Sequence, residues 1–176
     1  MELAGKNVVV LVGPGFEDLE FWVPVMRLQE AGANVAVVGI QAGKSYTSKS
    51  GGLTAIADTA AEDVDIEQLD AVVVPGGWAP DKLRRYPAIT GLVRKTYEAG
   101  KIVASICHGG LVLISAGIVS GRRATGSEGI RDDLINAGAS WTYDEPALRD
   151  GSLVWGRVVP DIPAFCRELV AALSET

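Results

Sequence analysis

The chain is poor in the residues that hold soft metals and build disulfide frameworks. Among 176 residues it has one histidine, His108, and two cysteines, Cys107 and Cys166. The three are not spaced as a zinc ligand set, so the sequence predicts neither a metal site nor a cofactor. A disulfide is the weaker alternative in a chain without an export signal, and we expect two thiols.

The chain also lacks an excess of positive charge and a long apolar run. Its formal net charge is −6, and its basic residues are dispersed, which disfavours a nucleic-acid partner. No apolar run reaches the roughly 18 residues of a membrane span, and the first residues do not resemble a secretory leader. We therefore expect a cytoplasmic protein without a membrane partner.

No linker, internal repeat or low-complexity tract interrupts the sequence. Hydrophobic residues make up 48% of the chain, enough to bury a sizeable core. We expect a single domain over residues 1–176.

Short β-branched runs alternate with longer segments of helical period. The predicted strands are 7–12, 33–40, 70–77, 101–106, 140–144 and 152–158, and the predicted helices are 16–32, 80–99, 109–116, 128–138 and 163–173. Residues 41–60 are expected to form a hairpin excursion. Because parallel strands need crossover connections, this order predicts a flavodoxin-like three-layer αβα sandwich with a mostly parallel central sheet.

The segment 16–32 is predicted to be an amphipathic helix. Leu19, Trp22, Val23 and Met26 recur at intervals of three and four residues, and Gly32 ends the pattern.

Three polar loops follow predicted strands: GPGFEDLE at 13–20, PGGWAPD at 75–81 and CHGG at 107–110. In open α/β sheets, ligands bind beyond the carboxyl ends of the strands. We therefore interpret the three loops as parts of one site.

Cys107 leaves a strand and enters a helix within a few residues, and Gly109 and Gly110 permit a sharp turn. This pattern is typical of a nucleophile elbow, where a helix N-terminus favours the thiolate. His108 is the only imidazole that could act as its base. The alternatives are a buried apolar cysteine and a histidine that only packs.

The first loop offers two carboxylates that share a helix face, Glu17 and Glu20, while Asp18 points elsewhere. Apolar neighbours can raise the pKa of Glu20 enough for it to donate a hydrogen bond to a thiolate. Complementing the helix dipole is the alternative role. The GPG stretch is not a dinucleotide loop, because Asp18 occupies the third-glycine position.

The second loop brings Gly76 and Gly77, whose amides can approach a ligand closely. With Gly109 and Glu17 they form the predicted oxyanion and substrate-binding set. Asp81 either orients His108, from the same chain or a neighbouring one, or is simply a first-turn acid.

The motifs together resemble the ThiJ/PfpI superfamily, most closely its intracellular-protease-I branch. The resemblance rests on GFEDLE, VVVPGGWAPD, VASICHGGLVLISAGI, GIRDDLINAG and GRVVPDIPAF, which cover nearly the whole chain in order. It implies Cys107 as the nucleophile, Glu20 in contact with its sulfur, and oxyanion amides near Gly77 and His108. It also implies an acid from an adjacent subunit of a dimer or hexamer, here Asp81 where the family usually has Glu.

A second departure from the family pattern is Ser127 and Glu128, where relatives tend to carry an aromatic residue and a proline. This predicts a wetter and more acidic pocket wall. The single histidine at 108 excludes a glutamine amidotransferase, whose histidine lies far downstream.

The family's activities include peptidase, glutathione-independent glyoxalase and deglycation of methylglyoxal adducts. We expect a stress-protective cysteine enzyme in which Cys107 attacks an electrophilic carbonyl. The alternatives are a cysteine peptidase or amidase, and a non-catalytic redox sensor or chaperone that works through oxidation of Cys107. Cys166 is predicted to belong to the core.

Overall fold

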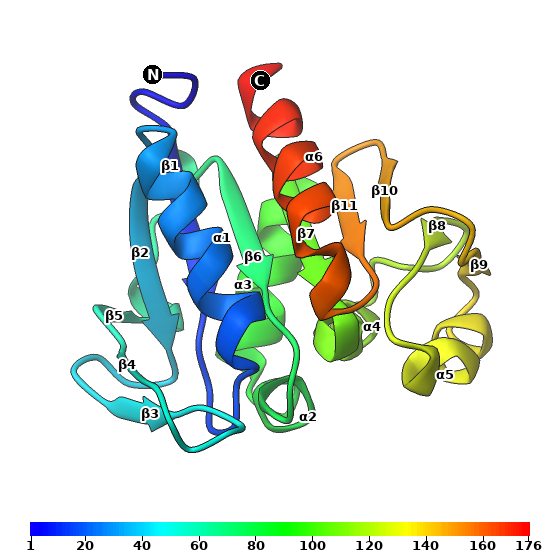
Figure 1. Cartoon of the computed structure of the whole chain (residues 1–176), viewed down its shortest axis with the longest axis horizontal. Helices are drawn as coiled ribbons and strands as arrows, with labels where there is room; N and C mark the ends of the chain where they lie inside the picture. The colour runs from blue at the N-terminus through cyan, green and yellow to red at the C-terminus, as the bar shows by residue number, and fades with distance from the viewer.

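A central sheet of seven strands runs through the computed structural model, which describes residues 1–176 (Figure 1). The strands are β1 (Asn7–Leu11), β2 (Asn34–Gly39), β5 (Thr59–Ala60), β6 (Ala71–Val74), β7 (Ile102–Ile106), β10 (Ala147–Asp150) and β11 (Leu153–Gly156). Their order across the sheet is β10-β11-β7-β6-β1-β2-β5, and every pair is parallel except β10 with β11.

Helices cover both faces of this sheet. On one face α1 (Asp18–Glu30) packs beside α6 (Ile162–Ser174). On the other face α4 (Gly110–Ala116) contacts α2 (Ala79–Leu83) and α3 (Pro87–Glu98), and α5 (Arg131–Asn136) packs against α4. The four residues of β6 and the five of β7 are all buried, as both faces of a covered parallel sheet require. The predicted three-layer fold is confirmed.

Two small strand pairs stand outside the main sheet. Strands β3 (Ser45–Thr47) and β4 (Thr54–Ile56) form the predicted hairpin, and β8 (Arg123–Ala124) runs parallel to β9 (Ser140–Trp141). Five single turns of 3-10 helix complete the fold: η1 (Ala61–Asp63), η2 (Ile66–Gln68), η3 (Cys107–Gly109), η4 (Glu128–Ile130) and η5 (Val159–Asp161). None of the helices is long and apolar enough to span a membrane.

The single helix predicted over 80–99 is wrong, because α2 ends at Leu83 and α3 begins at Pro87. Proline disfavours the helical region for the residue before it, and Tyr86 is extended, with φ −101° and ψ 116°. Pro87 then takes the first helical position, where its missing N–H costs nothing. Asp81 therefore lies in a short separate helix, where its side chain is exposed.

Helix α1 buries the face opposite to the predicted apolar stripe. Its buried residues include Phe21, Val25 and Leu28, whereas Val23 is 37% exposed and Met26 is 60% exposed. Both sets recur with helical period, so periodicity alone could not identify the core-facing side. The outer stripe of α1 is therefore apolar surface.

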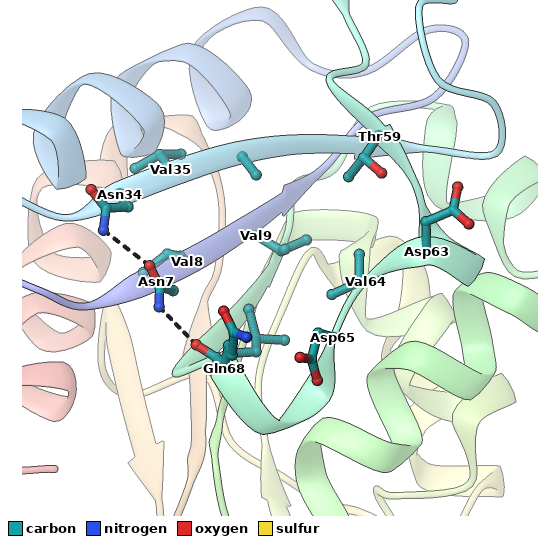
Figure 2. Close-up of a pocket in the computed structure, with 12 residues that line it drawn as sticks. Asn7, Val8, Val9, Asn34, Val35, Thr59, Asp63, Val64, Asp65 and Gln68 are labelled. Carbon is teal, nitrogen blue, oxygen red and sulfur yellow. Dashed lines mark hydrogen bonds between the residues drawn. The ribbon is translucent and has the colours of Figure 1, made fainter.

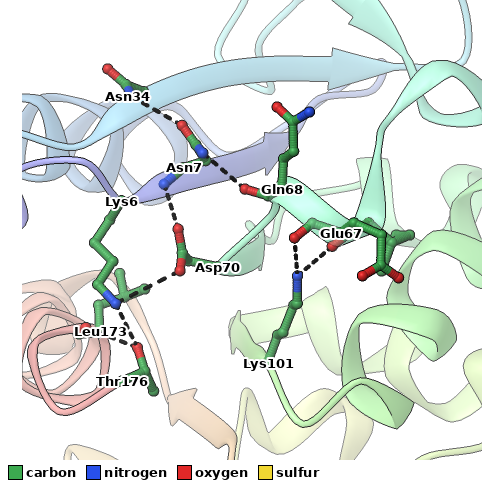
Figure 3. A network of polar contacts seen from close by, with 10 residues as sticks. Lys6, Asn7, Asn34, Glu67, Gln68, Asp70, Lys101, Leu173 and Thr176 are labelled. Atoms are coloured by element: carbon green, nitrogen blue, oxygen red, sulfur yellow. Dashed lines mark hydrogen bonds and ion pairs between the residues drawn. The ribbon is translucent and has the colours of Figure 1, made fainter.

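Polar contacts link the residues at the amino ends of the strands (Figure 3). Asn7 donates its backbone N–H to Asp70 at 2.7 Å, and its side-chain amide bonds to the Gln68 carbonyl at 2.8 Å. The Lys6 ammonium donates to Thr176 Oγ1 at 3.2 Å and so connects the last residue to the first strand.

A cavity of about 340 Å³ lies beside β1 and β2 at this same end, under the η1–η2 segment (Figure 2). Asn7 and Asn34, the first residues of the two strands, line it together with Val9, Val64 and Asp65. It holds none of the residues that the sequence predicts for the site, which all lie at the carboxyl ends.

Candidate active site

The three predicted loops meet at the carboxyl ends of β1, β6 and β7, which are neighbours in the sheet. They surround a cavity of about 390 Å³ lined by Glu17, Glu20, Lys49, Gly77, Trp78, Cys107, His108, Ser127, Val158, Val159 and Pro160. The strand order reverses direction beside β1, and this is where doubly wound sheets bind their ligands. No group of three or more His, Cys, Asp or Glu side chains is arranged to hold a metal ion.

Cys107 is the turning point between β7 and α4. Its φ of 59° makes it the only non-glycine residue with positive φ in the chain. This conformation costs an L-residue on the order of 1–2 kcal/mol, so the surrounding packing must impose it. The half-buried side chain faces the cavity.

Gly109 and Gly110 serve a different purpose from the one predicted. Both have ordinary right-handed angles, with φ of −54° each, so the turn does not depend on them. A Cβ at Gly109 would lie 2.3 Å from the Val74 carbonyl oxygen, and one at Gly110 would lie 2.8 Å from Ile130 Cδ1. The two glycines allow close packing behind the elbow.

His108 lies against the thiol that precedes it. Its Nδ1 is 3.2 Å from Cys107 Sγ, within reach of a sulfur hydrogen bond. Burial lowers the pKa of His108, the Lys49 ammonium lowers it further, and Asp133 opposes both. The imidazole is therefore neutral near pH 7 and able to accept a proton.

Glu20 is the most deeply buried acid of the site, with 1% of its surface exposed. The Gly76 amide donates to its Oε2 at 3.0 Å, and its carboxyl shares a hydrogen bond with Cys107. Burial, and next the charge of Glu17, raise the pKa of Glu20 to about 7. Glu20 is thus a carboxyl that can carry a proton beside the sulfur at neutral pH.

The thiol of Cys107 is not ionised by its position alone, contrary to the expectation from the helix N-terminus. Burial and the Glu20 carboxylate raise its pKa to about 12, although the backbone N–H groups of His108 and Gly77 oppose this rise. A proton on Glu20 removes the repulsion between carboxylate and thiolate. Attack therefore requires proton transfer within the group formed by Cys107, His108 and Glu20.

Glu17 lies just outside α1 as its N-cap. Its Oε2 accepts from the backbone N–H groups of Leu19 at 2.9 Å and Glu20 at 2.8 Å. This bonding satisfies donors that a helix start leaves free and fixes the orientation of Glu20.

Gly76 and Gly77 let the second loop approach the other two. A Cβ at Gly76 would lie 2.3 Å from Glu20 Oε2, and one at Gly77 would lie 2.4 Å from the Glu17 nitrogen. Gly77 also has a φ of 80°, which L-residues other than glycine rarely adopt. Only glycine fits at either position.

Asp81 is not brought to His108 within this chain. It is exposed on α2 and forms an ion pair with Arg85 at 2.6 Å. The pKa of His108 responds to Asp133 of α5 instead. A contact between Asp81 and His108 would require a second subunit.

The two residues predicted to form the pocket wall, Ser127 and Glu128, do not both reach the cavity. Ser127 lines the cavity, while Glu128 is exposed and does not. Glu128 therefore adds no acidic side chain to the cavity wall, and of the two predicted residues only Ser127 contributes a polar one.

Two parts of the cavity were not predicted from the sequence: Lys49, and the wall of Val158, Val159 and Pro160. Lys49 sits in the turn of the β3–β4 hairpin, far from any predicted loop of the site. The cue in the sequence was a lysine between two serines just before Gly51 and Gly52.

Comparison with known proteins places these features in a family. The DJ-1/PfpI family model matches residues 6–172. This chain belongs to the DJ-1/PfpI family. The chain is 44% identical over 167 residues to Deglycase TK1284 of Thermococcus kodakarensis, a match that covers 95% of this chain and 99% of that protein. It is 36% identical over 168 residues to Protein/nucleic acid deglycase 2 of Escherichia coli, covering 96% and 98% of the two chains.

Solved structures of the family share the fold. A two-domain protein from Anabaena variabilis, with DJ-1/ThiJ/PfpI-like and ferritin-like domains, superposes with a TM-score of 0.93 and 39% identity. That match covers 96% of this chain and 48% of the Anabaena chain. Drosophila melanogaster DJ-1beta gives a TM-score of 0.90 at 26% identity, covering 98% and 92% of the two chains.

Proposed function

We propose that this protein is a cysteine-dependent deglycase that acts on methylglyoxal and its early adducts. One observation carries the proposal: Cys107, in its left-handed conformation, places Sγ 3.2 Å from the only imidazole and beside the buried carboxyl of Glu20. The relatives named deglycase, at 36–44% identity over almost their full length, support this reading.

In the proposed reaction, His108 accepts the thiol proton and Cys107 Sγ adds to the aldehyde carbon of methylglyoxal. The new C–S bond moves an electron pair onto oxygen, and the amides of Gly77 and His108 donate to that oxyanion. A base then removes the proton from the former aldehyde carbon to give an enediol. Return of a proton to the neighbouring carbon, with the hydroxyl proton passing to the former ketone oxygen, gives the lactate thioester. Water then hydrolyses the thioester, so water is the only co-reactant.

The cavity volume of about 390 Å³ suits a small carbonyl compound or a single modified side chain better than an extended peptide. Gly77 and His108 line it, as do Ser127, Val158 and Val159. This favours deglycation over general proteolysis.

The test is conversion of methylglyoxal and of a glycated peptide to lactate, measured in parallel on wild type, Cys107→Ser and Cys166→Ser. We expect Cys107→Ser to lose at least about 100-fold in kcat and Cys166→Ser to match wild type. Full turnover by Cys107→Ser would eliminate the proposal. Casein cleavage measured on the same samples distinguishes a peptidase.

A second candidate, oxidation sensing, is favoured by the protonatable Glu20 beside the sulfur. A sulfinate at Cys107 would accept a hydrogen bond from that carboxyl. Mass spectrometry after mild peroxide, showing two added oxygens at Cys107 in a protein that turns over no carbonyl, would support this function instead. The cytoplasmic location and the dimer or hexamer stay predictions from the sequence.

A further inference from the structure

Lys49 is the only lysine or arginine that lines the Cys107 cavity. Its ammonium lies 6.0 Å from the ring centroid of Trp78, another lining residue, and takes part in none of the ion pairs of the chain. Lysine side chains are flexible, so an unpaired one stays at a site only if its backbone is held there.

Asp18 binds both residues that flank Lys49. Ser48 Oγ donates to Asp18 Oδ1 at 2.7 Å, and the Ser50 backbone N–H donates to Oδ2 at 3.2 Å. The Ser50 hydroxyl also donates to Asp18. Burial alone would raise the pKa of Asp18, but hydrogen bonds from Ser50 and Ser48 lower it below its ordinary value, which keeps the acceptor charged.

The turn is fixed further by the backbone of the first loop. Lys49 donates its N–H to the Phe16 carbonyl at 2.7 Å, and Gly15 donates to the Thr47 carbonyl at 2.9 Å. Ser48, which is 5% exposed, accepts from the Leu53 N–H at 3.1 Å and so closes the turn on itself. The turn and the start of α1 therefore form one rigid unit.

We propose that Asp18 is a positioning residue of the active site, which holds the Lys49 ammonium over the Cys107–His108 cavity by binding the two serines beside it. The residue affected by this positioning is His108. That imidazole contacts Cys107, and its charged neighbours are Lys49 from the β3–β4 turn and Asp133 from α5, with Glu17 and Glu20 lining the same cavity from α1. Lys49 is the only cation among these groups, and its charge disfavours protonation of the ring.

His108 is the sole histidine, so its ring protons titrate without overlap in a one-dimensional NMR spectrum. We expect Lys49→Met to raise the pKa of His108 by about 0.3 to 1. Asp18→Asn removes a negative charge, and that direct effect would lower the pKa of His108. If Asp18 acts by holding Lys49, the substitution releases the cation and raises the pKa instead, so the sign separates the two mechanisms.

The double variant completes the test. In the Lys49→Met background, Asp18→Asn should produce no rise, because the cation that it positions is gone. Ser50→Ala changes no charge and should raise the pKa of His108 in the same direction as Asp18→Asn. Lys44→Met is the matched control, since Lys44 does not line the cavity, and it should leave the titration unchanged.

A fall or no change in Asp18→Asn, or an equal rise with and without Lys49, would overturn the proposal. If Asp18→Asn fails to fold, Ser50→Ala decides the same question. The inference uses the proposed role of His108 as base, but the titration needs no turnover. A protein with the expected shifts and no methylglyoxal activity would therefore refute the proposed function alone.

Discussion

The amide of Gly76 donates to Glu20 Oε2 at 3.0 Å, and this contact brings the second loop of the site against the first. A Cβ on residue 76 would lie 2.3 Å from that oxygen and 2.7 Å from Cys107 Cβ. We expect Gly76→Ala to displace both groups, lowering kcat for methylglyoxal at least about tenfold and the free energy of unfolding by about 1–3 kcal/mol.

Gly91→Ala provides the matched control for Gly76→Ala. Gly91 lies within α3, and no atom lies within 4 Å of where its Cβ would be. Alanine there should stabilise the protein by roughly 0.5–1 kcal/mol and leave activity unchanged. Equal activity of the two variants would show that the Gly76–Glu20 contact does not matter for catalysis.

Glu20 should make stability fall as pH rises. Because burial raises its pKa to about 7 from an ordinary 4.5, the folded chain holds a proton that the unfolded chain releases. The stability associated with this proton is fully present below about pH 4.5 and is lost as pH rises toward 7. In urea unfolding at pH 5 and pH 8, wild type should lose more stability than Glu20→Gln, by on the order of 3 kcal/mol. Equal losses of stability in wild type and Glu20→Gln would contradict the raised pKa of Glu20.

Asp81 should contribute to activity only by acting on the active site of a neighbouring subunit. Its exposed pair with Arg85 contributes at most about 0.5 kcal/mol, so Asp81→Ala should fold normally. We expect it to lose activity, and a mixture with Cys107→Ser, unfolded and refolded together, to regain part of it. In the mixed oligomer, the intact Cys107 of one subunit meets the intact Asp81 of the other. Full activity of Asp81→Ala alone would remove the residue from the mechanism.

Cys166 should be a packing residue only. It is 5% exposed within α6, and burial raises the pKa of its thiol to about 11. Cys166→Ala should reduce the free energy of unfolding by about 1 kcal/mol and leave kcat unchanged. Thermal unfolding and the lactate assay on one preparation measure both effects.

The sequence predicts most of the sheet, because runs such as residues 7–11 and 102–106 are mostly apolar, with Asn7 and Ser105 as their only polar members. It misses β10, in which only Leu148 of four residues is buried. It also chooses the wrong face of α1, since two stripes of equal period lie on that helix. Which stripe meets the sheet is decided by tertiary packing.

The sequence predicts which residues form the site better than it predicts their pKa values. Cys107, His108 and Glu20 do meet, because the ends of neighbouring parallel strands converge. The raised pKa of the thiol could not be predicted, since it depends on the burial of Glu20 against Cys107 in three dimensions. The position of Lys49 in the cavity could not be predicted either, because Lys49 lies in a hairpin for which the sequence predicted no role.

The cavity wall of Val158, Val159 and Pro160 follows β11, the last strand of the main sheet in chain order. The thiol, by contrast, lies in the middle of the chain, and Glu20 lies near its beginning. During synthesis, Glu20 and Cys107 are therefore made before the residues that form this wall. In a refolding experiment, full turnover requires β11 and α6 to have joined the sheet, which recovery of helix content alone would not reveal.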